Sequence, residues 1–351
     1  MTFNPQHLLI QSNNITLHCV AQGDTNAPLV ICCHGFPGLW YSWRHQLTAL
    51  AAAGYLAVAI DQRGYGRSDR PSDPARYDSN TLVADTLGVL DHFNREQAIF
   101  IGHDFGAALV YNIAVRHPER VTAVVGVACP YDFDLAGRGC AGANPPAANI
   151  YNRAFARPDK YPSECFAEIA LQHFYHMHWY QSPDIPEQAL APNAELFLRR
   201  LFWALSADGN LLDWTQFPMA GTSYVDVLAE PAKALPWSWM TKADLDYYVS
   251  EFCHCDIGKE FIGGINSYRT ADRNWEIGLA YADHNIVQPS LYITGSEDPV
   301  RQMIGEDAMA AFKARSTDLR GIKVIPNAGH FVQMEQAVQF NQVLLQFLQS
   351  L

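Results

Sequence analysis

Positive charge is scarce in this sequence. Its 351 residues include 24 Lys and Arg against 36 Asp and Glu, which gives a formal net charge of −12, and no Lys/Arg-rich run occurs. A protein that binds nucleic acid needs a basic face, and an acidic protein is repelled by an anionic membrane surface. We therefore expect neither nucleic acid nor a membrane as a partner.

Long apolar runs and a signal-peptide pattern are missing too. No run approaches membrane-spanning length, and the N-terminus has no basic segment followed by an apolar one. The eight cysteines are scattered, apart from the adjacent Cys32 and Cys33, so they do not form a disulfide framework. Cys253-His254-Cys255 has neither the spacing nor the second half of a structural zinc site. We expect a cytoplasmic protein without a metal or other cofactor.

What the chain does have is a large apolar fraction, with 49% hydrophobic and 12% aromatic residues. This is enough for a large buried core, and the length fits one catalytic domain that carries an insertion. The sequence leaves the oligomeric state open, and a homodimer is one of the states that it allows.

Short apolar runs predict the strands of a mostly parallel sheet. Runs that are apolar on both faces are typical of strands covered by helices on both sides, and the more mixed segment 15–20 predicts an antiparallel edge strand. Segments 81–93, 105–116 and 336–351 have helical character. Strands that alternate with helices predict an α/β fold. The runs are residues 29–33, 55–60, 98–101, 121–127, 291–293 and 322–325.

The alternation stops after the run that ends at residue 127. From about residue 131 to 267 the chain holds a Gly/Pro/Ala loop at 136–148 and then aromatic-rich segments of helical character, and strand-like order resumes at Ser290. We interpret this stretch as a helical cap inserted after the sixth strand. The predicted domains are a core of residues 1–130 and 271–351 and a cap of residues 131–270.

A strand–turn–helix motif holds the candidate nucleophile. Gly102-His103-Asp104-Phe105-Gly106 lies between an apolar run and a helical segment, which is the setting of a nucleophile elbow. An isolated aspartate here would be expected to cap the helix, but the flanking glycines and the partners described next favour a nucleophile. A carboxylate is ionised at neutral pH, and its attack on a saturated carbon forms an ester that water must cleave.

Two partners follow the last strands in the order typical of this arrangement, acid and then histidine. His330 follows the final apolar run and is the candidate general base. Asp298 follows the run before it and is the candidate acid that holds the His330 ring, while the adjacent Glu297 remains an alternative.

The loop His34-Gly35-Phe36-Pro37 follows the first apolar run. In this arrangement such a loop supplies one backbone N–H of an oxyanion hole, and the residue after the nucleophile supplies the other. The predicted donors are therefore Phe36 and Phe105.

Together these motifs resemble those of the epoxide hydrolases of the α/β-hydrolase superfamily, over nearly the whole chain. The motifs are the 34–37 loop, the runs 40–46 and 61–68, the elbow at 102–106 and Gly329-His330-Phe331. The resemblance implies the α/β-hydrolase fold. It also implies that an epoxide and water become a vicinal diol through an ester on Asp104, which water activated by His330 hydrolyses.

The cap carries the oxygen-binding groups that this resemblance implies. Asn266-Ser267-Tyr268-Arg269 resembles the segment with a tyrosine that hydrogen-bonds the epoxide oxygen, which points to Tyr268. The family usually has a second cap tyrosine seven residues before a proline. Counting back from Pro183 gives His176, as in a subset of epoxide hydrolases and in fluoroacetate dehalogenases. A shift of one residue would make Tyr175 the second group, so both assignments stay open.

Aromatic and apolar residues near these groups predict a small apolar epoxide as the substrate; they are Phe36, Phe105, Trp179 and Met177. A haloalkane or haloacid dehalogenase with the same Asp nucleophile is the alternative. The resemblance to those enzymes would require polar side chains where Phe36, Phe105 and Ala108 stand. A serine esterase is disfavoured because the elbow has no serine, and a non-catalytic binding protein because no triad member is missing.

Overall fold

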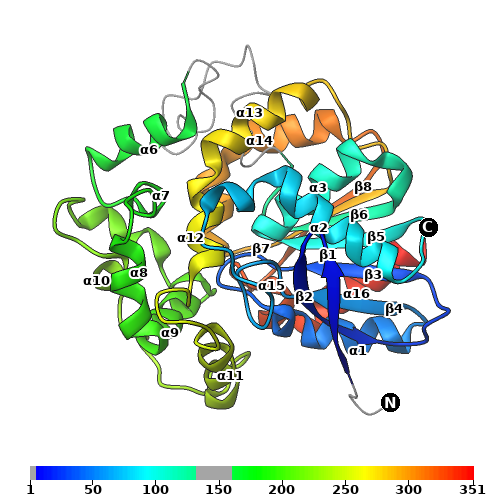
Figure 1. Ribbon diagram of the computed structural model, residues 1–351, viewed down its shortest axis with the longest axis horizontal. Helices are drawn as coiled ribbons and strands as arrows, with labels where there is room; N and C mark the ends of the chain where they lie inside the picture. Colours follow the sequence, from blue (N-terminus) through cyan, green and yellow to red (C-terminus); the bar gives the residue numbers. More distant parts are fainter. Residues whose placement is uncertain (1–4, 132–159) are drawn as a thin grey trace.

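The computed structural model describes residues 5–131 and 160–351, and an eight-stranded sheet lies at its centre (Figure 1). The strand order is β1-β2-β4-β3-β5-β6-β7-β8. β2 pairs antiparallel with β1 and β4, and all other neighbours are parallel. The strands are β1 (Gln6–Ser12), β2 (Ile15–Gln22), β3 (Leu29–Cys33), β4 (Leu56–Ile60), β5 (Ala98–His103), β6 (Val121–Val127), β7 (Ser290–Gly295) and β8 (Leu319–Ile325).

The predicted fold class is confirmed, because the apolar runs, apart from Tyr55, lie in parallel strands. The 15–20 segment lies in the antiparallel β2 as expected, but it is not the edge strand, because β1 pairs with its outer side. β3, β4, β5 and β7 are buried along their whole length, as expected for strands with helices on both faces. β1 was not predicted. Most of its residues are exposed or partly exposed, and its short apolar run, Leu8 to Ile10, is flanked by polar residues on both sides.

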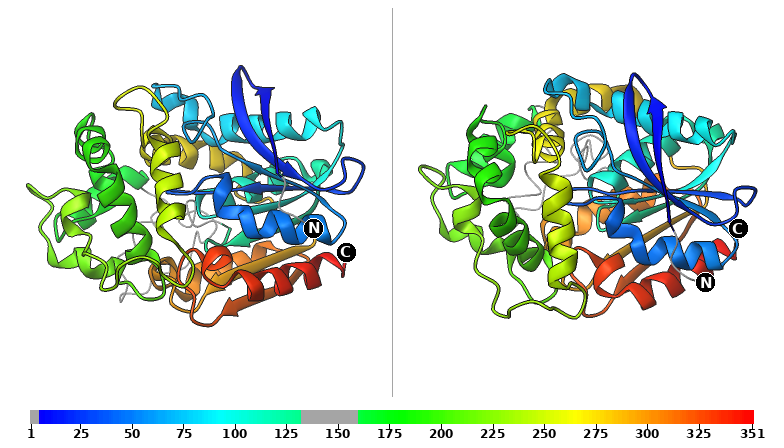
Figure 2. Two further views of the ribbon diagram at one scale, coloured as in Figure 1. Left: turned by 90° about the horizontal axis from the view of Figure 1, so that it is seen from below. Right: turned by 60° about the horizontal axis from the view of Figure 1, so that its bottom comes forward.

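Helices pack on both faces of the sheet, as Figure 2 shows with α1 and α16 on one side and α2 and α3 on the other. Their apolar residues form two cores with the side chains of the strands, one on each face. The 105–116 and 336–351 segments are helical as predicted. These helices are α1 (Arg44–Ala52), α2 (Ser79–His92), α3 (Phe105–Arg116), α14 (Pro299–Arg315), α15 (Val332–Glu335) and α16 (Ala337–Leu348).

Between β6 and β7 the described residues form helices and no strand of the sheet. The predicted loop at 136–148 lies outside the described residues. The helices form a separate apolar cluster and lie to one side of the sheet, coloured green to yellow in Figure 1. They are α6 (Pro162–Ala170), α7 (His176–Trp179), α8 (Ile185–Leu190), α9 (Ala194–Leu205), α10 (Tyr224–Val227), α11 (Lys242–Phe252), α12 (Ile262–Arg269) and α13 (Ala271–Gly278).

Among the described residues, no helix has both the length and the apolar character needed to cross a membrane. Within the same residues, no three His, Cys, Asp or Glu side chains, including those at 253–255, are grouped closely enough to hold a metal ion.

Candidate active site

Asp104 lies on a strained turn between β5 and α3. Its φ of 57° and ψ of −122° lie outside the regions that most residues other than glycine adopt. The turn is closely packed: a Cβ on Gly102 would lie 1.9 Å from the Gly106 oxygen, and one on Gly106 would lie 2.2 Å from the Cys33 oxygen. Only glycines fit these two positions, and strain of this kind is concentrated at active sites. The elbow predicted from the sequence therefore has a physical reason for both glycines.

The carboxylate of Asp104 is held on one side by the 34–37 loop. The Phe36 N–H donates a hydrogen bond of 2.9 Å to Asp104 Oδ1, and a Cβ on Gly35 would lie 2.1 Å from the same oxygen. Phe105 is the first residue of α3, so Asp104 lies at the positive end of this helix. For the Phe105 N–H, by contrast, no hydrogen bond to another described residue is found.

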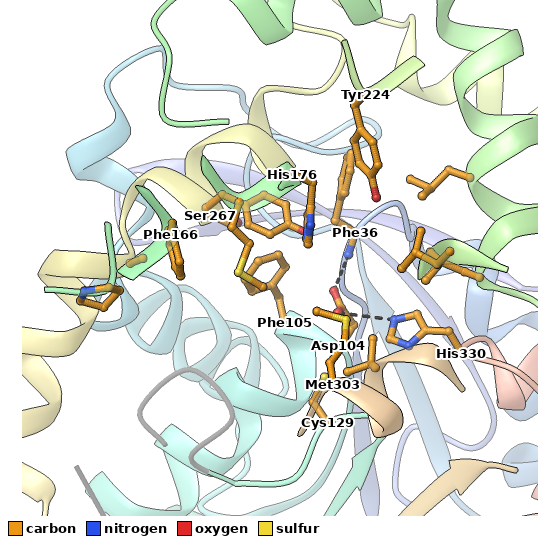
Figure 3. Close-up of a pocket in the computed structure, with 18 of the residues that line it drawn as sticks. Phe36, Asp104, Phe105, Cys129, Phe166, His176, Tyr224, Ser267, Met303 and His330 are labelled. Carbon is orange, nitrogen blue, oxygen red and sulfur yellow. Dashed lines mark hydrogen bonds and ion pairs between the residues drawn. The ribbon is translucent and has the colours of Figure 1, made fainter. Parts of the chain in front are cut away.

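His330 faces the other side of the carboxylate, as Figure 3 shows. Its Nε2 is 3.5 Å from Asp104 Oδ2, and its Nδ1 is 3.1 Å from Asp298 Oδ1. Asp298 is fully buried, and the Val300 N–H donates to its Oδ1 at 2.9 Å. Glu297 is exposed. The structure therefore brings Asp104, His330 and Asp298 together and leaves Glu297 outside.

The two carboxylates determine the charge of His330. Burial alone would lower the pKa of His330, but Asp298 and Asp104 outweigh burial and raise this pKa to about 10. In the same way, burial would raise the pKa of Asp104, but His330 holds it below its ordinary value. The two neighbouring aspartates therefore favour the protonated form of His330 in the free enzyme.

A cavity with about 940 Å³ of empty space opens above Asp104. It is lined by residues near the sheet and by residues of the helices between β6 and β7 (Figure 3). These helices supply three polar rings, Tyr268, His176 and Tyr224, and most of the remaining wall is apolar. The apolar and aromatic lining residues include Phe36, Phe105, Phe166, Met177, Leu201, Leu205 and Met303.

Tyr268 lies near the end of α12, and its ring packs edge-to-face on Phe105 at 4.9 Å and flat on Tyr180 at 4.5 Å. Burial raises the pKa of Tyr268 well above its ordinary value, and Asp104 adds to this shift. The hydroxyl therefore keeps its proton and can donate it in a hydrogen bond. No described residue accepts that hydrogen bond, so the hydroxyl is available to a molecule in the cavity.

His176 lines the cavity and Tyr175 does not. The His176 ring stacks on Trp214 at 4.6 Å and meets Tyr268 edge-on at 5.3 Å. Its Nδ1 is buried without a hydrogen-bond partner among the described residues, so Nε2 is the nitrogen left for the cavity. Burial lowers the pKa of His176 to about 3, and the ring is neutral. Tyr175 is fully buried, and its hydroxyl donates to Met177 Sδ at 3.2 Å.

Of the two predicted pocket residues in α7, Met177 lines the cavity and Trp179 does not. Trp179 is buried in the next layer, where it packs against Tyr224 at 6.2 Å and Tyr180 at 5.3 Å. Tyr224 itself lines the cavity, and Trp179 packs against the Tyr224 ring.

Tyr224 is a polar cavity residue that the sequence analysis did not identify. It begins the short helix α10, where Ser223 caps the helix by accepting from the Asp226 N–H. Its hydroxyl points into the cavity in Figure 3 and finds no acceptor among the described residues. Burial and the nearby Asp104 raise the pKa of Tyr224. The only local signal in the sequence is the Ser223 cap, which predicts a helix start and nothing about the cavity.

Comparisons with known proteins identify the family of this chain. Residues 28–160 match the family model of the α/β-hydrolase fold. Epoxide hydrolase A of Mycobacterium tuberculosis is 35% identical, over 99% of this chain and 98% of its own. The crystal structure of epoxide hydrolase A from Mycobacterium thermoresistibile superposes with a TM-score of 0.81 at 34% identity, over 99% and 98% of the two chains. An epoxide hydrolase from an endophytic Streptomyces gives 0.85 at 33% identity, over 98% and 95%. The chain therefore belongs to the epoxide hydrolases of the α/β-hydrolase fold.

Proposed function

We propose that this enzyme converts a small apolar epoxide and water to a vicinal diol through an ester on Asp104. One observation carries the proposal: the Asp104 carboxylate has one oxygen bound by the Phe36 N–H and the other turned toward His330 and the cavity. The first oxygen is placed to become the ester carbonyl. The second, Oδ2, is left as the nucleophile.

In the first half-reaction, Oδ2 attacks an epoxide carbon and the carbon–oxygen bond of the ring breaks. The ring oxygen takes the electron pair, and Tyr268 and His176 Nε2 donate hydrogen bonds to it. Donors placed for charge that develops in the transition state lower the barrier most. The alkoxide then gains a proton. We assign this proton to His330, through water, because esterification removes the negative charge of Asp104 that holds the proton on the ring.

In the second half-reaction, neutral His330 takes a proton from water, and the hydroxide attacks the ester carbonyl. The Phe36 N–H, together with the N–H predicted at Phe105, stabilises the oxyanion on Oδ1. Collapse breaks the bond between the carbonyl carbon and Oδ2, so the diol leaves with the former Asp104 oxygen. Asp298 keeps the His330 ring in place and stabilises its charged form.

The cavity supports an apolar substrate. Its wall is formed largely by phenylalanine, leucine and methionine side chains, which gain free energy when they exclude water. Tyr224 adds one hydroxyl above Asp104, and we propose that it donates a hydrogen bond to the substrate. In this proposal residues 131–270 form the cap that carries Tyr268, His176 and Tyr224, and residues 1–130 with 271–351 form the core that carries Asp104 and His330.

A dehalogenase with the same nucleophile is the competing function. A halide ion needs N–H donors beside the nucleophile, and the side chains of Phe36 and Phe105, which line the cavity there, offer none. These rings favour the epoxide over a haloalkane.

A turnover assay and a labelling experiment test the proposal. The enzyme should release diol from styrene oxide and leave a chlorinated or brominated alkane untouched. Asp104→Ala should abolish diol release, while Asp208→Ala, which changes an exposed aspartate, should have no effect. In a single turnover in oxygen-18 water, the diol should be unlabelled and the label should enter Asp104. Label in the diol of the first turnover would mean that water attacks the epoxide directly, and it would refute the ester mechanism.

A further inference from the structure

Glu335 is a carboxylate that the proposed chemistry does not use. It ends the short helix α15, five residues after His330. Burial raises the pKa of Glu335 to about 7, although three backbone N–H groups that donate to it favour the anion. An acidic side chain kept in such a place needs a structural or functional reason.

All three N–H groups belong to the surroundings of His330. Glu335 Oε2 accepts from the Gly329 N–H at 2.9 Å, and Oε1 accepts from the Phe331 N–H at 3.1 Å. The same Oε2 accepts from Ala207 at 2.9 Å, in the segment that follows α9 of the cap. One carboxylate therefore binds the residues on both sides of His330 and links them to the cap.

The remaining backbone groups of His330 are held as well. The His330 N–H donates to the Leu205 oxygen at 2.8 Å, and the His330 oxygen lies 2.8 Å from His103 Nε2. A Cβ on Gly329 would lie 2.4 Å from the carbonyl carbon of Ser206, so the loop packs directly against the cap. Among the described residues, Glu335 is the one side chain that accepts hydrogen bonds from two backbone N–H groups of this loop, those of Gly329 and Phe331.

We propose that Glu335 is a positioning residue for ester hydrolysis: it fixes the His330 loop against the end of α9, so that Nε2 stays within reach of the water that attacks the ester. This inference rests on the proposed function. The attack that opens the epoxide ring depends on Asp104, which the Phe36 N–H holds, and the proton that His330 supplies through water is transferred only after the ring has opened. Loss of Glu335 should therefore slow the second half-reaction and leave the first largely intact.

Glu335→Gln is the sharpest change. A glutamine keeps the size of the side chain but replaces one acceptor oxygen by an NH₂ group, which must face a backbone N–H and repel it. A side chain that only fills space would tolerate this change. A positioning role would not, because a misplacement of about 1 Å can cost roughly 10²-fold in rate.

The test measures the two steps separately. With styrene oxide, Glu335→Gln should lower kcat by about 10- to 100-fold, and KM should fall with it, so that kcat/KM stays within about threefold. Quenched samples should show the alkyl-enzyme by mass spectrometry as the main form during turnover. Glu335→Asp, which keeps the charge on a shorter side chain, should recover part of kcat, and it also tests the inference if the glutamine variant does not fold.

Glu251→Gln is the matched control. Glu251 is also a buried carboxylate, but it binds Arg67 rather than the His330 loop. It should change thermal stability without accumulation of the alkyl-enzyme. Equal losses of kcat and kcat/KM in Glu335→Gln, or no loss at all, would overturn the positioning role. If His330→Gln accumulates the adduct and Glu335→Gln does not, the ester mechanism stands and only this inference fails. If neither does, the ester mechanism itself is wrong.

Discussion

His176 and Tyr175 offer the clearest test of how the cap binds the epoxide oxygen. The structure places His176 in the cavity wall and turns the Tyr175 hydroxyl toward Met177 Sδ. His176→Phe removes the only N–H that the cavity receives from this ring. It preserves the flat ring that stacks on Trp214, so the change tests hydrogen bonding rather than packing.

The size of the effect follows from the state of the ring. Burial lowers the pKa of His176 to about 3, so at neutral pH the ring is uncharged and can donate from one nitrogen only. Removing one preorganised donor to a developing oxyanion costs about 10²–10³-fold. Because Tyr268 remains as a second donor, we expect a loss near the lower limit, about 10²-fold in the alkylation rate. His176→Tyr should restore part of it, since a phenol can also donate.

Alkylation can be measured alone in a His330→Gln background, where the ester should persist. The rate at which the protein gains the mass of one substrate then reports the first step. Tyr175→Phe in the same background should stay within about twofold, because its hydrogen bond to sulfur stabilises the fold by roughly 1 kcal/mol or less and does not reach the substrate. A 10²-fold loss in Tyr175→Phe, with His176→Phe tolerated, would refute the assignment and shift the pair by one residue.

Four further changes have defined outcomes. His330→Gln should slow ester hydrolysis by about 10²–10⁴-fold and accumulate the adduct, which mass spectrometry detects. Tyr268→Phe should slow alkylation sharply in the same assay, because one of two donors to the ring oxygen is lost. Asp298→Asn should lower the pKa of His330, since its largest stabilising charge disappears, and a titration of the His330 ring by NMR should show the shift. The free energy of unfolding should fall as the pH drops below about 6.5, because His176 and His103 bind protons in the unfolded chain but not in the folded protein, where their pKa values are about 3. Thermal unfolding between pH 7 and 5 measures this loss of stability, which should be smaller in His176→Phe.

The fold could be predicted because buried strands have a recognisable apolar pattern in the sequence. Strands covered on both faces are uniformly apolar, and the runs at 29–33 and 121–127 coincide with β3 and β6. β8 begins three residues before the predicted run. Its first residues, Leu319 to Gly321, mix polar and apolar side chains at the edge of the sheet, so they do not form an apolar run. Edge strands such as β1 expose most side chains, so the pattern that marks central strands is absent from them.

The three triad residues could be predicted from the sequence for a different reason. Asp104, Asp298 and His330 each follow a strand, and glycine or proline marks the turn beside each one. The cap half has no such marks. Tyr224 comes from a four-residue helix, and its place in the cavity depends on how α10 packs against α7. Trp179 packs against Tyr224, which lines the cavity, while Trp179 itself is not among the lining residues. Side-chain order in layers is a tertiary property that single-sequence patterns do not encode.

The charge on His330 connects the two halves of the proposed reaction. With both carboxylates ionised, the pKa of His330 is about 10, and a protonated ring cannot accept a proton from water. Esterification of Asp104 neutralises one of the two charges, so the pKa of His330 must fall in the alkyl-enzyme. The proton that leaves the ring is the one that the alkoxide needs, and the neutral ring is then the base that ester hydrolysis needs. Hydrolysis restores the Asp104 carboxylate and, with it, the proton on His330. In the proposed reaction Asp298, which contacts His330 Nδ1, keeps the ring oriented in both states, and its own carboxylate is fully buried and held by the Val300 N–H.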